Sequence, residues 1–329
     1  MNLKVRALSA LTTLAVAMAA TCAHAAGFQR GVAADPAGKP LEIGIWYPSH
    51  ATPAPLALGP TTMSVALNGA VEGSALPLVV ISHGSGGSYL EHYDTAIALA
   101  DAGYVVAAVT HTGDNYADHS RAVLIMERPK QMSRVIDHML SSWDGRAKVD
   151  SSRIGMFGFS SGGFTTLVNI GGVPDFSKVG PMCREYPEDY ACRQIAKSGQ
   201  AAIAPPDSSL ARDDRIKAAV VAAPALGFTF SPDGLKDVRM PVQLWSAEDD
   251  VILPPARFAE AVRQVLPQAP DYHVVRKAGH FDFLPPCSDA LASIAPAICS
   301  SAPGFDRPAF HQAFNNSVVD FFGKNLKRN

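Results

Sequence analysis

The sequence has 329 residues, of which 47% are hydrophobic and 18% are charged, a balance typical of one large globular domain or two small ones. This composition excludes a disordered chain. Lysine and arginine total 28 against 30 aspartate and glutamate, so the formal charge of -2 gives no basic surface for a polyanion, and we expect no nucleic-acid partner.

The N-terminus has the pattern of a secretory signal peptide. Two basic residues precede an apolar stretch at 7–20, and the tripeptide Ala-His-Ala at 23–25 has the small residues of a cleavage site. The stretch is shorter than the roughly 20 apolar residues of a membrane-spanning helix, which disfavours a retained anchor. We therefore predict a signal peptide at 1–25, cleaved near Ala25, a secreted or periplasmic location, and no membrane span in the mature protein.

Beyond the predicted cleavage site, short apolar runs alternate with segments of helical periodicity. Residues 41–48 alternate like a half-buried strand, and the later runs are continuously apolar, which is typical of buried parallel strands. The expected strands are 41–48, 78–82, 104–109, 154–159, 216–222, 242–245 and 272–275, and the expected helices are 89–102, 134–143, 161–170, 256–266 and 308–326. This order predicts a single α/β domain at 26–329, with a mostly parallel sheet and helices on both faces.

One long interval, at about 173–214, breaks this rhythm. It holds five prolines and two cysteines and has no clean period. A connection of this length in a compact domain is typical of a lid or a binding loop, and a decorative insertion held by a disulfide is the alternative. We favour a lid-like insertion.

Four cysteines remain after removal of the predicted signal peptide, which contains the fifth. An even number of cysteines outside the cytoplasm predicts disulfides. Because a short loop loses the least entropy on closure, the expected pairs are Cys183 with Cys192 and Cys287 with Cys299. A zinc site is the alternative, but C-x-x-C and H-E-x-x-H spacings do not occur, and we expect no metal.

The sequence contains one G-x-S-x-G pattern, at 158–162, between a predicted strand and a predicted helix. A serine in the sharp turn there needs glycine two positions to either side, because its backbone is strained and the flanking segments pass close together. We predict that Ser160 is a nucleophile. A glycine-rich helix start that serves packing alone is the alternative.

A serine nucleophile needs a base, and the base needs a carboxylate. His280 follows the last predicted strand, where sites collect in parallel sheets. Three acids, Glu248, Asp249 and Asp250, follow the strand at 242–245. The carboxylate fixes the imidazole tautomer and stabilises the imidazolium. We rank Asp250 first, because it begins the run that leads into the next helix, and Asp249 second.

Backbone amides near the same edge could stabilise a developing oxyanion. We expect one from Ser161, at a helix N-terminus, and the other from Ser85, in the glycine-rich loop 83–87. A tight turn without a ligand is the alternative for this loop. It fits neither a dinucleotide nor a phosphate motif, and we expect no cofactor.

The chain order Ser160, Asp250, His280 is that of α/β-hydrolases. Six segments carry a closer resemblance: His83-Gly84-Ser85-Gly86-Gly87, His111-Thr112-Gly113-Asp114-Asn115, Arg128-Pro129, Gly158-Phe159-Ser160-Ser161-Gly162, Ala247-Glu248-Asp249-Asp250 and Ala278-Gly279-His280-Phe281. Over nearly the whole mature chain, the sequence resembles the secreted branch of the dienelactone-hydrolase-like α/β-hydrolases, close to the platelet-activating-factor acetylhydrolase family.

This resemblance implies the α/β-hydrolase fold, Ser160 as nucleophile, Asp250 as acid, His280 as base, and the amides of Ser85 and Ser161 as oxyanion donors. Dienelactone hydrolases have a cysteine nucleophile where this sequence has Ser160, which favours an ester of a simpler acid as the substrate.

Together these features predict a serine esterase that acts on a small-molecule or lipid ester through an acyl-enzyme. A peptidase or acyltransferase with the same triad and an inactive binding protein with the same fold are the alternatives. We expect Phe228 and Phe230, which follow the strand at 216–222, to border the acyl pocket, although aromatic residues after a strand more often belong to the core.

Overall fold

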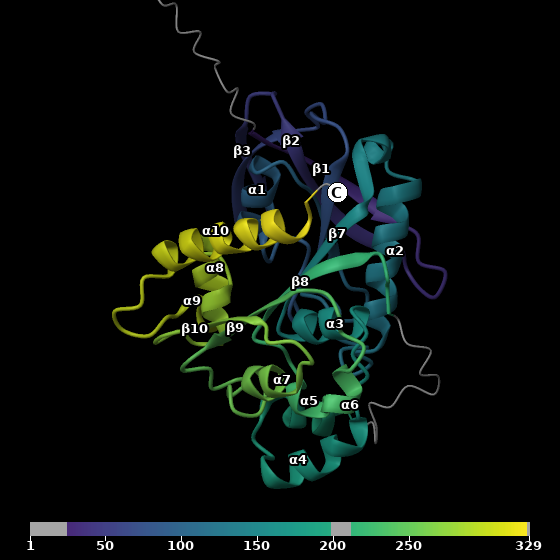
Figure 1. Cartoon of the computed structure of the whole chain (residues 1–329). Helices are drawn as coiled ribbons and strands as arrows, with labels where there is room; N and C mark the ends of the chain where they lie inside the picture. The colour runs from purple at the N-terminus through teal and green to yellow at the C-terminus, as the bar shows by residue number, and fades with distance from the viewer. Residues whose placement is uncertain (1–24, 199–211, 328–329) are drawn as a thin grey trace, which may run out of the picture.

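The structure is a computed structural model that describes residues 25–198 and 212–327 (Figure 1). Apart from Ala25, the predicted signal peptide lies outside the described residues, and so does the part of the predicted insertion at 199–211. None of the helices in the described ranges combines the length and the apolar character that crossing a bilayer requires.

The strands form one sheet in the order β10-β9-β8-β7-β5-β6-β2-β1-β4-β3. They are β1 (Ala25–Ala33), β2 (Leu41–Ser49), β3 (Ala54–Leu58), β4 (Thr61–Leu67), β5 (Leu76–Ser82), β6 (Val105–Thr110), β7 (Val149–Phe159), β8 (Ile216–Ala222), β9 (Val242–Ala247) and β10 (Asp271–Val275). The strands β5 to β10 pair in parallel, and β2 runs antiparallel to both β6 and β1. The predicted mostly parallel sheet is confirmed, while β1, β3 and β4 were not predicted.

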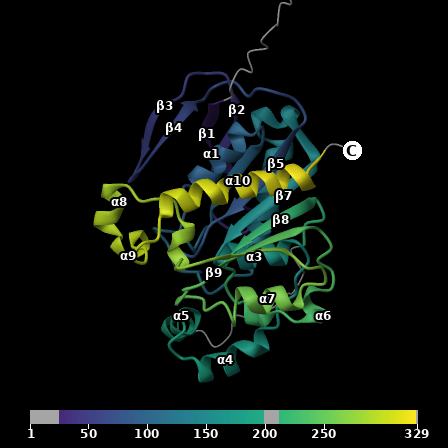
Figure 2. The same cartoon turned by 60° about the vertical axis from the view of Figure 1, so that its left-hand side comes forward.

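Helices cover both faces of this sheet (Figures 1 and 2). The α-helices are α1 (Tyr93–Asp101), α2 (Glu127–Ser141), α3 (Ser161–Asn169), α4 (Val179–Glu185), α5 (Tyr190–Ser198), α6 (Pro232–Leu235), α7 (Ala259–Val265), α8 (Asp289–Ile294), α9 (Pro296–Cys299) and α10 (Arg307–Asn325). Short 3₁₀ helices are η1 (Asp144–Lys148), η2 (Phe176–Lys178), η3 (Gly227–Thr229) and η4 (His280–Phe283). Helices α1 and α10 pack on one face, and α2, α3 and α7 pack on the other.

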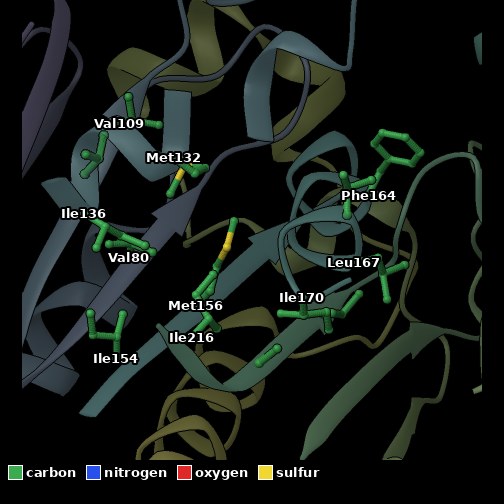
Figure 3. Packing of buried hydrophobic residues seen from close by; sticks show 14 of the residues in the cluster. Val80, Val109, Met132, Ile136, Ile154, Met156, Phe164, Leu167, Ile170 and Ile216 are labelled. Carbon is green, nitrogen blue, oxygen red and sulfur yellow. The ribbon is translucent and has the colours of Figure 1, made fainter. Parts of the chain in front are cut away.

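The side chains of β5 show why the buried strands are continuous apolar runs in the sequence. Val80 joins Met132 and Phe164 in the cluster under α2 and α3 (Figure 3). Val79 points to the opposite face and joins the cluster under α1 and α10. Successive residues of a strand face opposite sides, so a strand covered on both sides is apolar at every position.

Two predicted helices begin at a different residue in the structure. The helix predicted at 134–143 begins at Glu127 in the structure. Its first turns were not predicted, because their buried side chains include the polar Arg128 and Gln131, which give no apolar period. The helix predicted at 89–102 begins at Tyr93, after turns.

The predicted insertion at about 173–214 contains regular structure where none was predicted: it includes η2, α4 and α5. Its described part is held by a disulfide between Cys183 and Cys192. A second disulfide joins Cys287, which precedes α8, to Cys299, the last residue of α9. Both disulfides have the pairing that the sequence predicts.

Candidate active site

Three of the predicted site residues meet where parallel strands end. Ser160 directly follows β7, Asp250 lies three residues after β9, and His280 lies five residues after β10. The carboxyl ends of parallel strands share one edge of the sheet, so residues far apart in the sequence converge there.

Ser160 lies in a strained turn between β7 and α3. Its φ of 55° and ψ of -117° form a combination that non-glycine residues rarely adopt. Its amide donates to the carbonyl of Ala222 at 2.9 Å, and its own carbonyl accepts from the amide of Ala225 at 2.9 Å. The backbone is therefore held on both sides by the last residue of β8 and by the segment that follows it, which maintains strain of roughly 1 to 3 kcal/mol.

The glycines around Ser160 fit where no other residue does. A Cβ atom on Gly158 would lie 2.1 Å from the carbonyl oxygen of Gly162, and one on Gly162 would lie 1.9 Å from that of Ser82. Either substitution requires backbone to move. The physical reason given for the G-x-S-x-G spacing thus holds in the structure.

The side chains of Asp250, His280 and Ser160 form one chain of hydrogen bonds. Nδ1 of His280 lies 2.7 Å from Oδ2 of Asp250, and Nε2 lies 3.0 Å from Oγ of Ser160. A carboxylate only accepts, so Nδ1 carries the proton and Nε2 is free to accept from the serine. The Asp250 side chain is 1% exposed, and its Oδ1 accepts the amides of Ile252 and Leu253 at 2.9 and 2.7 Å.

The other two candidate acids point elsewhere. Glu248 and Asp249 are both exposed. Glu248 accepts the amide of Lys277 at 3.0 Å, and the amide of Asp249 donates to the carbonyl of Ala278 at 2.9 Å. The structure therefore brings Asp250, and neither neighbour, to His280.

The predicted oxyanion donors follow two neighbouring strands, β5 and β7. Ser82 at the end of β5 pairs with Gly158 of β7, so the loop that carries Ser85 and the start of α3 at Ser161 leave the sheet side by side. Neither the Ser85 nor the Ser161 amide donates to another residue in the described part of the chain. Such unsatisfied N–H groups are what a developing oxyanion requires.

Several charged residues around this loop were not predicted to act in the site. Glu91 accepts the amide of Gly84 at 2.7 Å, and Asp114 accepts the hydroxyl of Ser85 at 2.7 Å. Burial raises the pKa of the Glu91 carboxyl to about 7. Arg128 belongs to one of the six segments that carry the resemblance, but no role was predicted for it. It is buried beneath the same loop. The charge of Glu91 inside the helix predicted at 89–102 was the one signal in the sequence, because Arg128 precedes the helix predicted at 134–143.

The predicted pocket residues lie after β8. Phe230 is 4% exposed and packs on Phe164, with ring centroids 5.7 Å apart. Phe228 is half-buried and meets Phe258 edge to face at 5.6 Å. Both contacts belong to the cluster under α3 and α7.

The described part of the insertion is attached to the segment that follows Asp250. Arg257 donates to both carboxylate oxygens of Asp189 at 2.9 Å, and its guanidinium lies 3.9 Å from the ring centroid of Tyr186. Figure 1 shows α4 and α5 beside α7 at one end of the molecule. The insertion therefore lies near the acid loop.

Among residues 25–198 and 212–327, no group of three or more His, Cys, Asp and Glu side chains is arranged to hold a metal ion. The four cysteines considered as zinc ligands are paired in disulfides.

Comparisons with known proteins agree with this fold. Residues 66–226 match the model of the dienelactone hydrolase family, a region that includes Ser85 and Ser160 but ends before Asp250 and His280. A ferulic acid esterase from Streptomyces cinnamoneus is similar in structure, with a TM-score of 0.63 and 20% identity over 94% of this chain and 91% of that chain. No curated protein matches the sequence.

The fold is the α/β-hydrolase fold. The family match supports a hydrolase that acts on esters and takes a small-molecule substrate.

Proposed function

We propose that this protein is a secreted serine esterase that cleaves carboxylic esters through an acyl-enzyme. The observation that carries the proposal is the continuous hydrogen-bonded chain from Asp250 through His280 to Ser160, which ends at a serine in a strained turn. A buried carboxylate, a histidine in a fixed tautomer and a serine hydroxyl hydrogen-bonded to it are the three members of a catalytic triad, in which the serine is the nucleophile.

The reaction follows from this arrangement. Ser160 Oγ attacks the ester carbonyl while Nε2 of His280 takes its proton, and Asp250 stabilises the resulting imidazolium. The amides of Ser85 and Ser161 bind the oxygen of the tetrahedral intermediate. His280 then protonates the leaving alcohol, and water, activated by the same histidine, releases the acid from Ser160.

The proposed substrates are short-chain or lipid-like acyl esters, bordered by Phe228 and Phe230. Phe228 is the more exposed of the two and is the side chain whose removal should alter acyl preference. Replacing it by Ala should shift the preferred acyl length by a few methylenes, each worth about 0.8 kcal/mol when buried. An unchanged length profile in a folded variant would place the pocket elsewhere.

The proposal of secretion rests on the signal-like N-terminus and on the two disulfides. Structural disulfides persist in oxidising compartments and are rare in the cytosol. Expression with the native N-terminus, followed by N-terminal sequencing of the extracellular or periplasmic protein, tests cleavage near Ala25.

A fluorophosphonate probe followed by a substrate panel tests the chemistry. We expect the probe to label the wild type and not Ser160→Ala, and we expect turnover of p-nitrophenyl acetate but not of the matched anilide. Asp250→Asn should lower kcat by about 10³-fold or more, with Asp249→Asn as the matched control.

The alternatives give different results. Anilide turnover would favour a peptidase, and acyl transfer to an added alcohol in preference to water would favour an acyltransferase. A wild type that is neither labelled nor active would favour the inactive binding protein. If Asp249→Asn were crippling and Asp250→Asn mild, the assignment of the acid would be wrong.

A further inference from the structure

The direction of the Ser85 N–H is set by the peptide that joins it to Gly84. In a trans peptide the C=O and the N–H point in opposite directions, and the described chain contains no cis peptide. The Gly84 carbonyl accepts from Nη2 of Arg128 at 3.1 Å. The N–H of the same peptide therefore points away from the Arg128 guanidinium.

A neutral histidine holds the same carbonyl. Nε2 of His83 accepts the amide of His111 at 3.0 Å, so the ring proton lies on Nδ1, which is 2.5 Å from the Gly84 oxygen. Burial, and then the charge of Arg128, hold the pKa of His83 well below its ordinary value. The ring remains neutral and keeps this one orientation.

The preceding peptide, between His83 and Gly84, is held on both sides. Its carbonyl accepts from Nη2 of Arg128 at 2.7 Å, and its N–H donates to Oε2 of Glu91 at 2.7 Å. Arg128 is 2% exposed, and the Glu91 side chain is 13% exposed. Hydrogen bonds to charged groups are stronger than neutral ones, so two consecutive peptides are fixed by one cation and one carboxyl.

The other amides of the turn have acceptors. Gly86 N donates to Oδ1 of Asp114 at 3.2 Å, and Gly87 N donates to the carbonyl of Gly84 at 3.3 Å. Gly86 has a φ of 77°, which suits the third residue of this turn. From Gly84 to Gly87, the Ser85 amide is thus the one N–H without an acceptor among the described residues.

We infer that Arg128 and Glu91 form a buried clamp that orients the two peptides before Ser85 and so aims its N–H at the oxyanion. The inference rests on the proposed esterase function. Arg128 and Glu91 are positioning residues, because they act through the backbone of the loop 83–87 and contact no substrate. Donors that are oriented before the substrate arrives need no reorganisation in the transition state, which is how such sites accelerate acyl transfer.

The first test replaces Arg128 by Lys, which keeps the charge but loses the planar fork. Hydrolysis of p-nitrophenyl acetate should show kcat lowered by about 10- to 100-fold with KM within about twofold, since a misaligned donor affects the transition state alone. The matched control is Arg134→Lys on the same helix, whose guanidinium pairs with Asp35 outside the loop. This control should retain wild-type kcat.

A trifluoromethyl ketone separates positioning from general damage. Its adduct with Ser160 carries a negatively charged oxygen, so its Ki should rise in Arg128→Lys by the same factor by which kcat/KM falls. The corresponding methyl ketone binds without that charge, and its Ki should stay within about twofold. Equal weakening of both ketones, or an unchanged Ki for the fluorinated one, would overturn the clamp.

A second pair of variants tests the inferred clamp if Arg128→Lys does not fold. Glu91→Gln keeps an oxygen that can accept the Gly84 amide and should retain kcat within about threefold, whereas Glu91→Met removes the acceptor and should lower kcat about tenfold at constant KM. Wild-type kcat in folded Glu91→Met would reject the clamp. An inactive, unlabelled wild type would instead reject the proposed function, so the two failures are distinct.

Discussion

At the scale of the residue, Ser160 combines backbone strain with a fixed position. Two hydrogen bonds, to the end of β8 and to the segment that follows it, hold its backbone at a φ of 55°. Any side chain there is strained, because the Cβ crowds the backbone at positive φ. The fold therefore tolerates an unfavourable conformation at the position where the hydroxyl meets His280.

This strain predicts an order of stability between two inactive variants. Ser160→Gly should be more stable than Ser160→Ala by about 1 kcal/mol or more, since glycine relieves the strain by more than its added chain entropy offsets. Urea denaturation of both proteins measures the difference. Equal or reversed stabilities would show that the Ser160 backbone is not strained in the folded protein.

At the scale of the element, the loop after β10 is joined to the first turn of α10. Asp282 accepts the amide of Gly279 at 2.7 Å and Nε of Arg307 at 3.0 Å, and the two charged side chains are 2% and 5% exposed. Arg307 also donates to the carbonyls of Ile298 and Ser300 at 2.9 and 3.0 Å. One guanidinium thus fixes the histidine loop and the disulfide-linked segment of α9 to the same helix.

Removing this guanidinium should destabilise the protein and disturb the site. Arg307→Met leaves Asp282 buried without its cation, and we expect the free energy of unfolding to fall by about 3 to 5 kcal/mol. Arg263→Met is the control, because Arg263 forms an exposed pair with Glu260 on α7 and should cost less than about 1 kcal/mol. Denaturant titration of both variants checks the contrast; similar losses would contradict it.

The elements that the sequence predicted share a physical signature. Buried strands such as β5 and β8 are apolar at every position but Ser82 and Lys217, and α3 follows a turn in which two positions accept only glycine. The first turns of α2 were missed because their inward side chains are polar. Helices α4 and α5 were missed because their segment holds prolines and is fixed by a disulfide instead of a long apolar face.

The same distinction applies within the candidate site. Ser160 could be proposed from a motif that local geometry requires. His280 and the run of three candidate acids could be proposed from their positions after predicted strands. The sequence ranks Asp250 above Asp249 only by its place before the next helix, whereas the acid that meets His280 depends on how β9 and β10 lie side by side. The contacts of Glu91 and Arg128 with Gly84 are tertiary, and no spacing in the sequence indicates them.

At the scale of the whole molecule, stability depends on a histidine between the sheet and its outer helices. His92 is 2% exposed and lies edge-on to Phe157, with ring centroids 4.8 Å apart. Neither ring nitrogen has a hydrogen-bond partner among the described residues. Burial lowers the pKa of His92 to about 3, which is well below the value of an exposed histidine.

This shift gives stability a definite pH dependence. Above about pH 6.5 His92 is neutral in both states, and as the pH falls toward 3 the unfolded chain takes up a proton that the folded protein does not, so stability is lost. His92→Phe should remove up to roughly 1.4 kcal/mol of this loss per pH unit. Glu91, whose pKa is raised to about 7, acts in the opposite direction between its unfolded value and pH 7.

Because other groups also titrate in this range, the effect of His92 is measured as the difference in free energy of unfolding between His92→Phe and the wild type. Denaturant titrations at several values between pH 4 and 7 should show the stability of His92→Phe rising relative to the wild type as the pH falls. His119→Phe, at an exposed loop position, is the control and should track the wild type. A constant difference between His92→Phe and the wild type would mean that His92 is protonated equally in both states.

The wide spacing of the hydrogen-bonded chain also affects the timing of folding. His280 is 120 residues from Ser160 and 30 from Asp250, and the base reaches the serine only when β9 and β10 have joined the sheet. Contacts between distant parts of a chain form late, after the local ones. A chain that is still being made carries a serine without its base, so the proposed hydrolysis begins only once the last third of the protein has folded.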